Sequence, residues 1–167
     1  MTKVAGGWLV LLMALSAAAS VKAAEPESPV GTEGPEQVAA HVEELARMYF
    51  IKLGEFDHAG LRDMSTPEFE IMEHDGERAM RMGLDAFDER LRGAEAAGAE
   101  IRFIPHDFRT TVTSDAAWTL YVEKGALPRN ANSRFYGTMI FKRVGDRWLL
   151  DKMSTVPVPA GSPNFPD

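Results

Sequence analysis

The sequence predicts an α+β domain in which helices precede a β-sheet. Three observations support this prediction. Apolar residues recur with helical spacing at residues 36–54 and again after Gly83. From residue 101 onward they recur at every second position, as in strands. Residues 134–158 form a hairpin pattern, with Gly145 and Asp146 at the turn between two apolar runs.

The first residues predict an export signal that is not part of the fold. Lys3 is followed by a short apolar run from Trp8 to Leu15 and by small residues up to Ala23. This is the pattern of a secretory signal peptide that is cleaved after Ala23. The alternative is an uncleaved anchor, but the run is shorter than a membrane span. We therefore expect a signal peptide over residues 1–23 and a periplasmic or secreted protein.

Composition excludes several classes of function. The sequence has no cysteine, which excludes disulfides, thiolate chemistry and a lipid-modified cysteine at the cleavage site. The formal net charge is −7, and without residues 1–23, which carry Lys3 and Lys22, it becomes −9. A chain this acidic repels the phosphates of nucleic acids and anionic membranes. We expect no nucleic-acid partner, and no membrane partner once the signal peptide is removed.

Two proline-rich segments flank the predicted domain. Residues 24–35 are rich in proline, glycine and glutamate and contain almost nothing to bury, which predicts a disordered linker. Residues 159–167 are also proline-rich and predict a loose C-terminal tail. The domain itself is therefore expected over residues 36–158, which is enough chain for an ordinary hydrophobic core.

The helical segments have recognisable ends. In the first helix, Val38, Val42, Leu45 and Tyr49 fall on one face, and Gly54 closes the segment. A short second helix is expected over residues 56–64, with Asp57 as its N-cap.

A strand and a further helix follow this pair. Phe69, Ile71 and Glu73 alternate with their neighbours up to Asp75 and Gly76, which predicts a strand that ends in a turn. After that turn, Leu84, Phe87 and Leu91 have helical spacing and predict an amphipathic helix.

The remaining segments are strands. A long strand over residues 101–112 should be kinked near Pro105. The next strand, residues 117–123, places Trp118 on one face and Tyr121 and Glu123 on the other. In the hairpin that follows, both alternating sets contain large apolar residues, so we expect each face of the sheet to be covered by helices, a lid or a partner.

The order and spacing of several short motifs resemble the nuclear transport factor 2-like superfamily. The resemblance covers residues 36–158 and is greatest to the SnoaL-like and ketosteroid isomerase-like branches. The motifs are Gly54–Leu61, Asp75–Gly76, Gly83–Phe87, Asp115–Trp118 and Phe141–Leu150. The resemblance implies a cone-shaped, curved antiparallel sheet wrapped around a long N-terminal helix, as in cystatin-like folds. It also implies a pocket open at one end and a homodimer formed through the outer sheet face.

Two candidate catalytic residues follow from this resemblance. In the isomerase branch a tyrosine of the first helix donates to an oxyanion, and Tyr49 stands at the similar place. A carboxylate at the end of the first strand is the general base there, and Glu73 is the nearest match. An apolar pocket would suit both roles, because it raises a carboxylate's pKa into the working range. The alternatives are a core tyrosine for Tyr49 and a solvated strand end for Glu73.

A set of soft apolar and aromatic side chains could line a pocket for a small hydrophobic molecule. The candidate ligand-binding residues are Tyr49, Met72, Trp118, Phe135, Met139 and Met153. The alternative is that most of them fill the core. No cofactor is expected, and no metal, because consecutive Glu73, His74 and Asp75 on a strand point in opposite directions and cannot all bind one ion.

Three functions remain open at the level of sequence. The domain could bind a small apolar molecule, catalyse acid–base chemistry as an isomerase or cyclase with Glu73 and Tyr49, or act as a dimeric protein-interaction module. The sequence does not decide between enzyme and binding protein.

Overall fold

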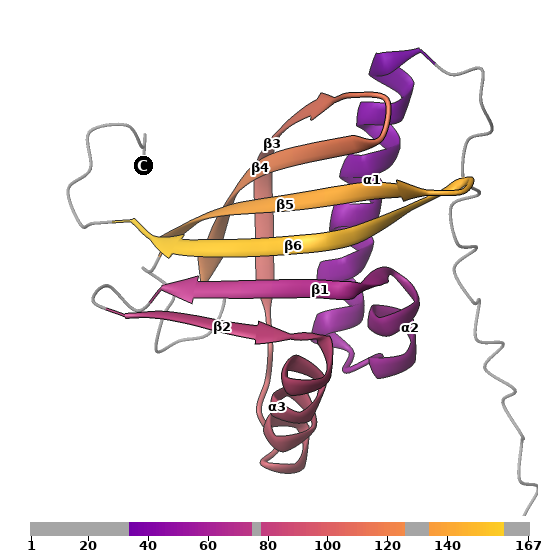
Figure 1. Cartoon of the computed structure of the whole chain (residues 1–167). Coiled ribbons are helices and arrows are strands. Elements are labelled where there is room, and N and C mark those ends of the chain that lie inside the picture. The colour runs from indigo at the N-terminus through magenta and orange to yellow at the C-terminus, as the bar shows by residue number, and fades with distance from the viewer. Residues whose placement is uncertain (1–33, 75–77, 126–133, 159–167) are drawn as a thin grey trace, which may run out of the picture.

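The computed structural model describes residues 34–74, 78–125 and 134–158 (Figure 1). Several predicted segments lie outside these residues. They are the signal peptide, most of the linker, the C-terminal tail and the turn at Asp75 and Gly76. The elements in chain order are α1 (Pro35–Gly54), α2 (His58–Asp63), β1 (Ser65–His74), β2 (Ala79–Gly83), α3 (Leu84–Ala96), β3 (Phe103–Val112), β4 (Ala116–Gly125), β5 (Arg134–Val144) and β6 (Arg147–Pro157). The predicted α+β class is confirmed. None of the helices in the described part of the chain has the length and apolar character needed to cross a membrane.

The strands form one curved, unclosed sheet in the order β2-β1-β6-β5-β4-β3, with α1 lying across one face (Figure 1). We call this face the inner face and the opposite one the outer face. The sheet is not wholly antiparallel as expected, because β1 pairs with β6 in parallel. A parallel pair needs a long connection, and here the chain between β1 and β6 carries α3 and four other strands.

Strand β2 was not expected from the sequence. It pairs antiparallel with β1, from Glu70 opposite Gly83 to His74 opposite Ala79, and forms one edge of the sheet. Four of its five residues are exposed, so apolar and polar positions do not alternate along it. An edge strand held mainly by backbone hydrogen bonds gives little periodic signal in the sequence.

Helix α1 buries the face that its apolar spacing predicts. Val42, Ala46, Tyr49, Phe50 and Leu53 are all buried against the inner face of the sheet. The Phe50 ring meets the Tyr121 ring of β4 edge to face, with centroids 5.1 Å apart. The helix is thereby fixed across the strands that form the upper part of the sheet in Figure 1.

The short helix α2 begins as predicted. Oδ1 of Asp57 accepts a hydrogen bond from the backbone N–H of Gly60 at 2.9 Å, which satisfies one of the free donors of the first turn. Strand β3 is kinked as expected, but the irregularity falls between His106 and Arg109, where Asp107 has φ 54°. Aspartate adopts this left-handed conformation more readily than most residues.

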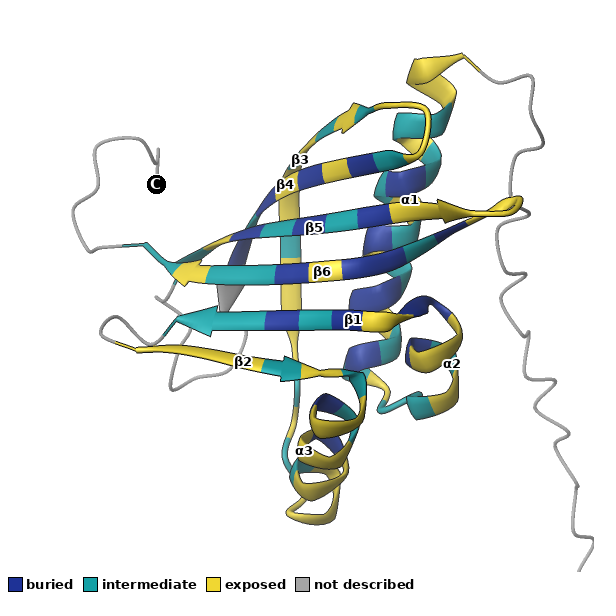
Figure 2. Cartoon of the chain, viewed as in Figure 1, coloured by how far each residue is buried: buried dark blue, intermediate teal, exposed yellow. Residues whose placement is uncertain are grey.

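Strand β4 shows how the two faces of the sheet differ (Figure 2). Ala117, Thr119, Tyr121 and Glu123 are buried on the inner face. The residues between them point outward, and several residues of the outer face are large, apolar and exposed. They are Trp118, Leu120, Tyr136 and Val156. Both faces carry large apolar side chains, as the sequence indicated, and these four on the outer face remain 39–49% exposed. The expected lid or partner over the outer face stays a prediction.

Candidate functional site

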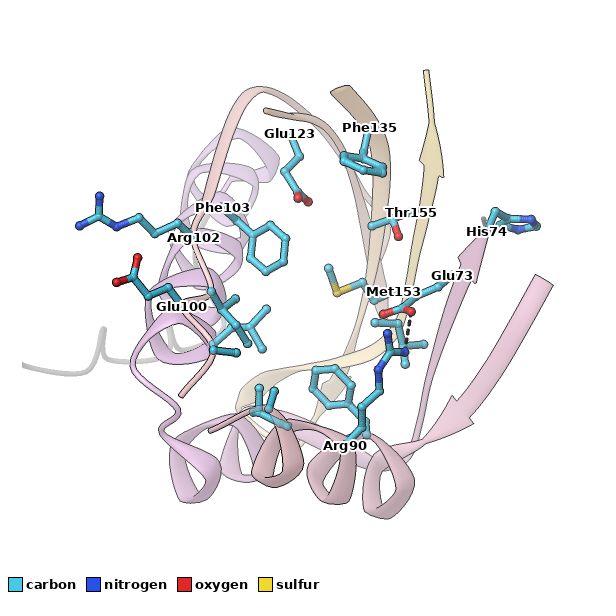
Figure 3. A pocket seen from close by; sticks show the side chains of 17 residues that line it. Glu73, His74, Arg90, Glu100, Arg102, Phe103, Glu123, Phe135, Met153 and Thr155 are labelled. Carbon is cyan, nitrogen blue, oxygen red and sulfur yellow. Dashed lines mark hydrogen bonds and ion pairs between the residues drawn. The ribbon is translucent and has the colours of Figure 1, made fainter. Parts of the chain in front are cut away.

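A cavity of about 420 Å³ lies at the end of the domain where α3 meets the sheet (Figure 3). Helix α3 forms one wall, and the C-terminal turn of α1 and the start of β3 form another. The far ends of β1, β4, β5 and β6 form the rest. The lining residues are Leu53, Ile71, Glu73, His74, Phe87, Arg90, Leu91, Ala94, Ala99, Glu100, Ile101, Arg102, Phe103, Glu123, Phe135, Met153 and Thr155.

Most of the wall is apolar. Phe87 and Leu91 come from the face of α3 that packs on the sheet, and Leu53 comes from the last turn of α1. Phe135 and Met153 come from the inner face of the hairpin. Small-molecule sites typically combine such walls with a few polar groups in a volume of roughly 300–1,000 Å³. This cavity fits that description.

Glu123 is the buried polar group of the cavity. It follows Tyr121 on the inner face of β4, lies opposite Phe135 of β5, and is only 3% exposed. In Figure 3 its carboxylate points into the cavity, between the rings of Phe103 and Phe135. Within the described residues this carboxylate has no hydrogen-bond or ion-pair partner. Burial raises the pKa of Glu123 from 4.5 to about 7.

A second carboxylate in the cavity is paired. Arg90 of α3 donates from Nη1 to Oε2 of Glu73, near the end of β1, at 2.6 Å (Figure 3). The Glu73 side chain is 31% exposed and that of Arg90 is 53% exposed. The pair therefore lies at the opening of the cavity, where water also reaches both groups, and the two charges compensate each other.

The other charged lining residues belong to the rim. Arg102, Glu100 and His74 all point away from the centre of the cavity in Figure 3. The interior of the site is thus apolar apart from the Glu123 carboxylate and the hydroxyl of Thr155.

Tyr49, the predicted oxyanion donor, does not line the cavity. It is fully buried in the core, where its ring lies 6.3 Å from that of Phe69. Its hydroxyl has no hydrogen bond in the described structure, and the nearby Ser65 hydroxyl donates instead to the carbonyl oxygen of Leu61 at 2.8 Å. Burial raises the pKa of Tyr49 above its ordinary value. The structure does not bring Tyr49 and Glu73 together in one site.

The predicted ligand-binding residues divide into three groups. Phe135 and Met153 line the cavity. Met139 is fully buried in the core. Trp118 points outward from β4 and is 39% exposed, and Met72 faces away from the inner side, because strand alternation sets it opposite to Ile71.

The possible metal cluster of Glu73, His74 and Asp75 does not assemble among the residues that can be placed. Glu73 points into the cavity and His74 away from it (Figure 3), and Asp75 lies outside the described residues. Across residues 34–74, 78–125 and 134–158, there is no group of three His, Cys, Asp or Glu side chains that could hold a metal ion.

The sequence does not single out Glu123 or Arg90. The position of Glu123 in the strand alternation is the one signal for it. It follows the buried positions 117, 119 and 121 of β4 at the same two-residue spacing, which places it on the inner face. A charged residue at a buried strand position is uncommon unless it is paired or functional. Arg90 gives no comparable signal, because its partner Glu73 lies 17 residues away on another element.

No protein-family model matches the chain, and no curated protein matches it in sequence. Solved structures do match. A candidate dehydratase of the nuclear transport factor 2-like family from Streptomyces avermitilis is 19% identical, with a TM-score of 0.60, over 76% of this chain and 100% of that one. A candidate ketosteroid isomerase from Parabacteroides distasonis is 13% identical, with a TM-score of 0.58, over 74% of this chain and 89% of that one.

A nuclear transport factor 2-like protein of unknown function from Silicibacter pomeroyi is also similar. It is 15% identical, with a TM-score of 0.59, over 74% of this chain and 98% of that one. At sequence identities this low, the similarity to these structures shows a shared fold and nothing more. The chain has the nuclear transport factor 2-like fold, and the resemblance in the sequence motifs is confirmed at that level.

Proposed function

We propose that the cavity binds a small, largely apolar organic molecule that has one polar group beside Glu123. The observation that carries this proposal is the buried carboxylate of Glu123, which faces a cavity of about 420 Å³ with apolar walls. Among the described residues this carboxylate has no partner, and it faces the cavity. A largely buried carboxylate without a partner is energetically unfavourable, so such a group is rarely kept where it only fills space. A ligand that supplies the missing partner would remove much of this cost.

A second candidate function is acid–base catalysis in the same cavity. Glu123 favours it, because a carboxyl group with a pKa of about 7 can both accept and release a proton near neutral pH. Glu73 is a weaker candidate for the base, since it must give up its bond to Arg90 before it accepts a proton. The two structural neighbours described as a candidate isomerase and a candidate dehydratase are compatible with proton transfer in this fold.

A homodimer through the outer sheet face is compatible with either function. Tyr136 and Val156 lie directly opposite each other on β5 and β6, and Leu120 lies on the adjacent β4. Exposed apolar residues gathered on one face are typical of interaction surfaces. A second copy of the chain would cover them without closing the cavity, which opens on the inner side.

Ligand binding can be tested through methionine methyl groups. Met153 lines the cavity, whereas Met80 is 49% exposed on β2 and does not. Titration of methyl-labelled protein with the neutral apolar probe N-phenyl-1-naphthylamine should shift the Met153 resonance and leave Met80 unchanged. The fluorescence of the probe should rise at the same concentrations.

A matched pair of variants on α3 separates cavity binding from surface binding. Ala94→Trp fills the cavity with an indole, whereas Ala86→Trp adds the same group at an exposed position outside the lining. We expect the probe to bind the Ala86→Trp variant as it binds the parent protein and to lose binding in Ala94→Trp. Equal binding by both variants would mean that the probe does not occupy the cavity.

A further inference from the structure

The charged side chains at the opening of the cavity are matched by opposite charges, but in the described part of the chain the acid in its interior is not. Glu73 is compensated by Arg90 at 2.6 Å, and the rim carries one further acid, Glu100, and one further base, Arg102. Glu123 has no such partner within the described residues. Its neighbour on the same strand, Tyr121, is buried with a hydroxyl that also has no hydrogen-bond partner there. Among the described residues, one buried acid of the cavity is therefore left without a compensating charge.

We propose that the ligand of this cavity is a cation, namely a small amine or ammonium compound with an apolar body, whose charged nitrogen binds the Glu123 carboxylate. The inference rests on the proposed ligand-binding function and assigns the chemical class of that ligand. A positively charged nitrogen supplies the opposite charge that Glu123 lacks, and an ammonium also supplies hydrogen-bond donors. The apolar body occupies the space between α3 and the sheet.

The aromatic side chains around Glu123 suit the same ligand. Phe135 lies directly opposite Glu123 on β5, and Phe103 lies on the other side of it in Figure 3. Aromatic faces attract cations, most strongly where water is excluded. A cation held by Glu123 would therefore lie between these two rings, of which Phe103 is 37% exposed, and could gain from their faces what a neutral ligand would not.

The charge of the whole chain points in the same direction. Its formal net charge is −7. An acidic protein attracts cations and repels anions over distances of about 10 Å at moderate ionic strength. An anionic ligand would meet both this field and the Glu123 carboxylate, with Arg90 already bound to Glu73.

The protonation of Glu123 makes the affinity for a cation depend on pH. Burial raises its pKa to about 7 in the free protein, so the group is partly protonated at neutral pH. A cation binds the ionised form, and its affinity should rise between pH 5.5 and 8. A carbonyl ligand would instead accept a hydrogen bond from the protonated form and should bind more weakly over the same range. The other charged or titratable lining groups, which are Glu73, His74, Arg90, Glu100 and Arg102, lie at the opening or the rim.

The test compares phenethylamine with 2-phenylethanol, which have the same apolar body and differ in charge. Binding is measured by calorimetry and by the Met153 methyl resonance at pH 5.5 and pH 8. We expect phenethylamine to bind at least about tenfold more tightly than the alcohol at pH 8, and this preference to shrink at pH 5.5. In Glu123→Gln the preference should disappear at both pH values, whereas Glu73→Gln should keep it.

The outcomes are distinguishable. Equal or tighter binding of the alcohol at pH 8, or an amine preference that persists in Glu123→Gln, would overturn the assignment of a cationic ligand while leaving the cavity as a binding site. Failure of both compounds to shift Met153 at millimolar concentration would overturn the proposed binding function and the cationic ligand together. The pH dependence is measured on the unaltered protein, so the test does not depend on the folding of any variant.

Discussion

Arg90 and Glu73 form an ion pair of 2.6 Å across the mouth of the cavity, joining α3 to the end of β1. The pair gives the two cavity carboxylates different properties. Glu73 is compensated and partly hydrated, whereas Glu123 is buried and has no charged partner among the described residues. Two acids in one cavity with such different surroundings can differ in charge state and in their affinity for a ligand.

Removal of Arg90 should therefore increase the affinity for cations. In Arg90→Met the Glu73 carboxylate loses its partner and adds a second negative charge to the cavity. We expect phenethylamine to bind about threefold or more tightly than to the parent protein, measured by calorimetry at pH 8. Arg92→Met is the matched control, because Arg92 lies on the same helix, pairs with Asp88 and does not line the cavity. An equal gain in both variants would show a general charge effect only.

Arg90→Met should have little effect on the free energy of unfolding. The Glu73–Arg90 pair is partly exposed on both sides, and such pairs contribute up to about 1 kcal/mol. Urea unfolding of the parent protein and Arg90→Met should therefore differ by no more than about 1 kcal/mol. A larger loss would mean that the pair holds α3 against the sheet.

Glu123 should lower stability as the pH rises. Its pKa is about 7 in the folded protein against 4.5 for the ordinary group, so the folded state binds the proton more tightly than the unfolded state. The stabilisation is complete below pH 4.5 and is lost as the pH rises through about 7. Between these two limits the contribution of Glu123 to the free energy of unfolding changes by about 3 kcal/mol, because each pKa unit corresponds to about 1.36 kcal/mol.

This prediction is tested by urea unfolding of the parent protein and Glu123→Gln at pH 5 and pH 8. Because other groups titrate equally in both proteins, the difference between them isolates Glu123. We expect Glu123→Gln to gain about 2–3 kcal/mol relative to the parent between pH 5 and pH 8. A constant difference between the two proteins would mean that Glu123 is not buried as a carboxylate in the free protein.

Gly137 should tolerate no side chain, because the ring of Tyr121 lies directly over it. A Cβ at position 137 would overlap the ring atoms of Tyr121 on the neighbouring strand. Since Tyr121 is itself packed against Phe50 and Phe108, it cannot move aside freely. We expect Gly137→Ala to lower the free energy of unfolding by about 1–3 kcal/mol.

The control for this substitution is Gly93→Ala on α3, where a Cβ meets nothing within 4 Å. Alanine favours a helix over glycine, so this variant should gain up to about 1 kcal/mol. In a Tyr121→Leu background, the cost of Gly137→Ala should fall, which a double-mutant cycle measures. An unchanged cost in that background would show that the overlap with Tyr121 is not its cause.

The outer sheet face should hold a homodimer together. Leu120 is 49% exposed at this face, and an aspartate there would place a charge in the interface. We expect the parent protein to sediment as a dimer and Leu120→Asp to sediment as a monomer. Ile51→Asp on α1 is the matched control, because Ile51 is 50% exposed and apolar but lies outside the sheet. A parent protein that sediments as a monomer at all concentrations would exclude the dimer.

Much of the fold could be predicted from local patterns. The helix expected over residues 36–54 is α1 at Pro35–Gly54, and the hairpin expected over 134–158 is β5 and β6. Both have a buried face, so their apolar residues recur with a definite period. Strand β2 could not be predicted in this way, because an exposed edge strand buries almost nothing.

The site was only partly predictable. Glu73, Phe135 and Met153 were expected and do line the cavity. Tyr49 belongs to the core, and Trp118 to the outer face. The sequence identifies which residues are aromatic or acidic, but the depth of each one depends on the elements that pack over it. Tyr49, for example, packs against Phe69 of β1, which lies 20 residues away in the chain.

The sequence by itself determined the periodic elements, the α+β class and the face of β4 on which Glu123 lies, because these depend on residues close together in the chain. The tertiary structure alone decided the pairing of Arg90 with Glu73 and the burial of Glu123 away from any partner in the described part of the chain. Both depend on how α3 and β3 close over the end of the sheet. Charge compensation and desolvation are properties of neighbours in space, and those neighbours come from segments far apart in the sequence.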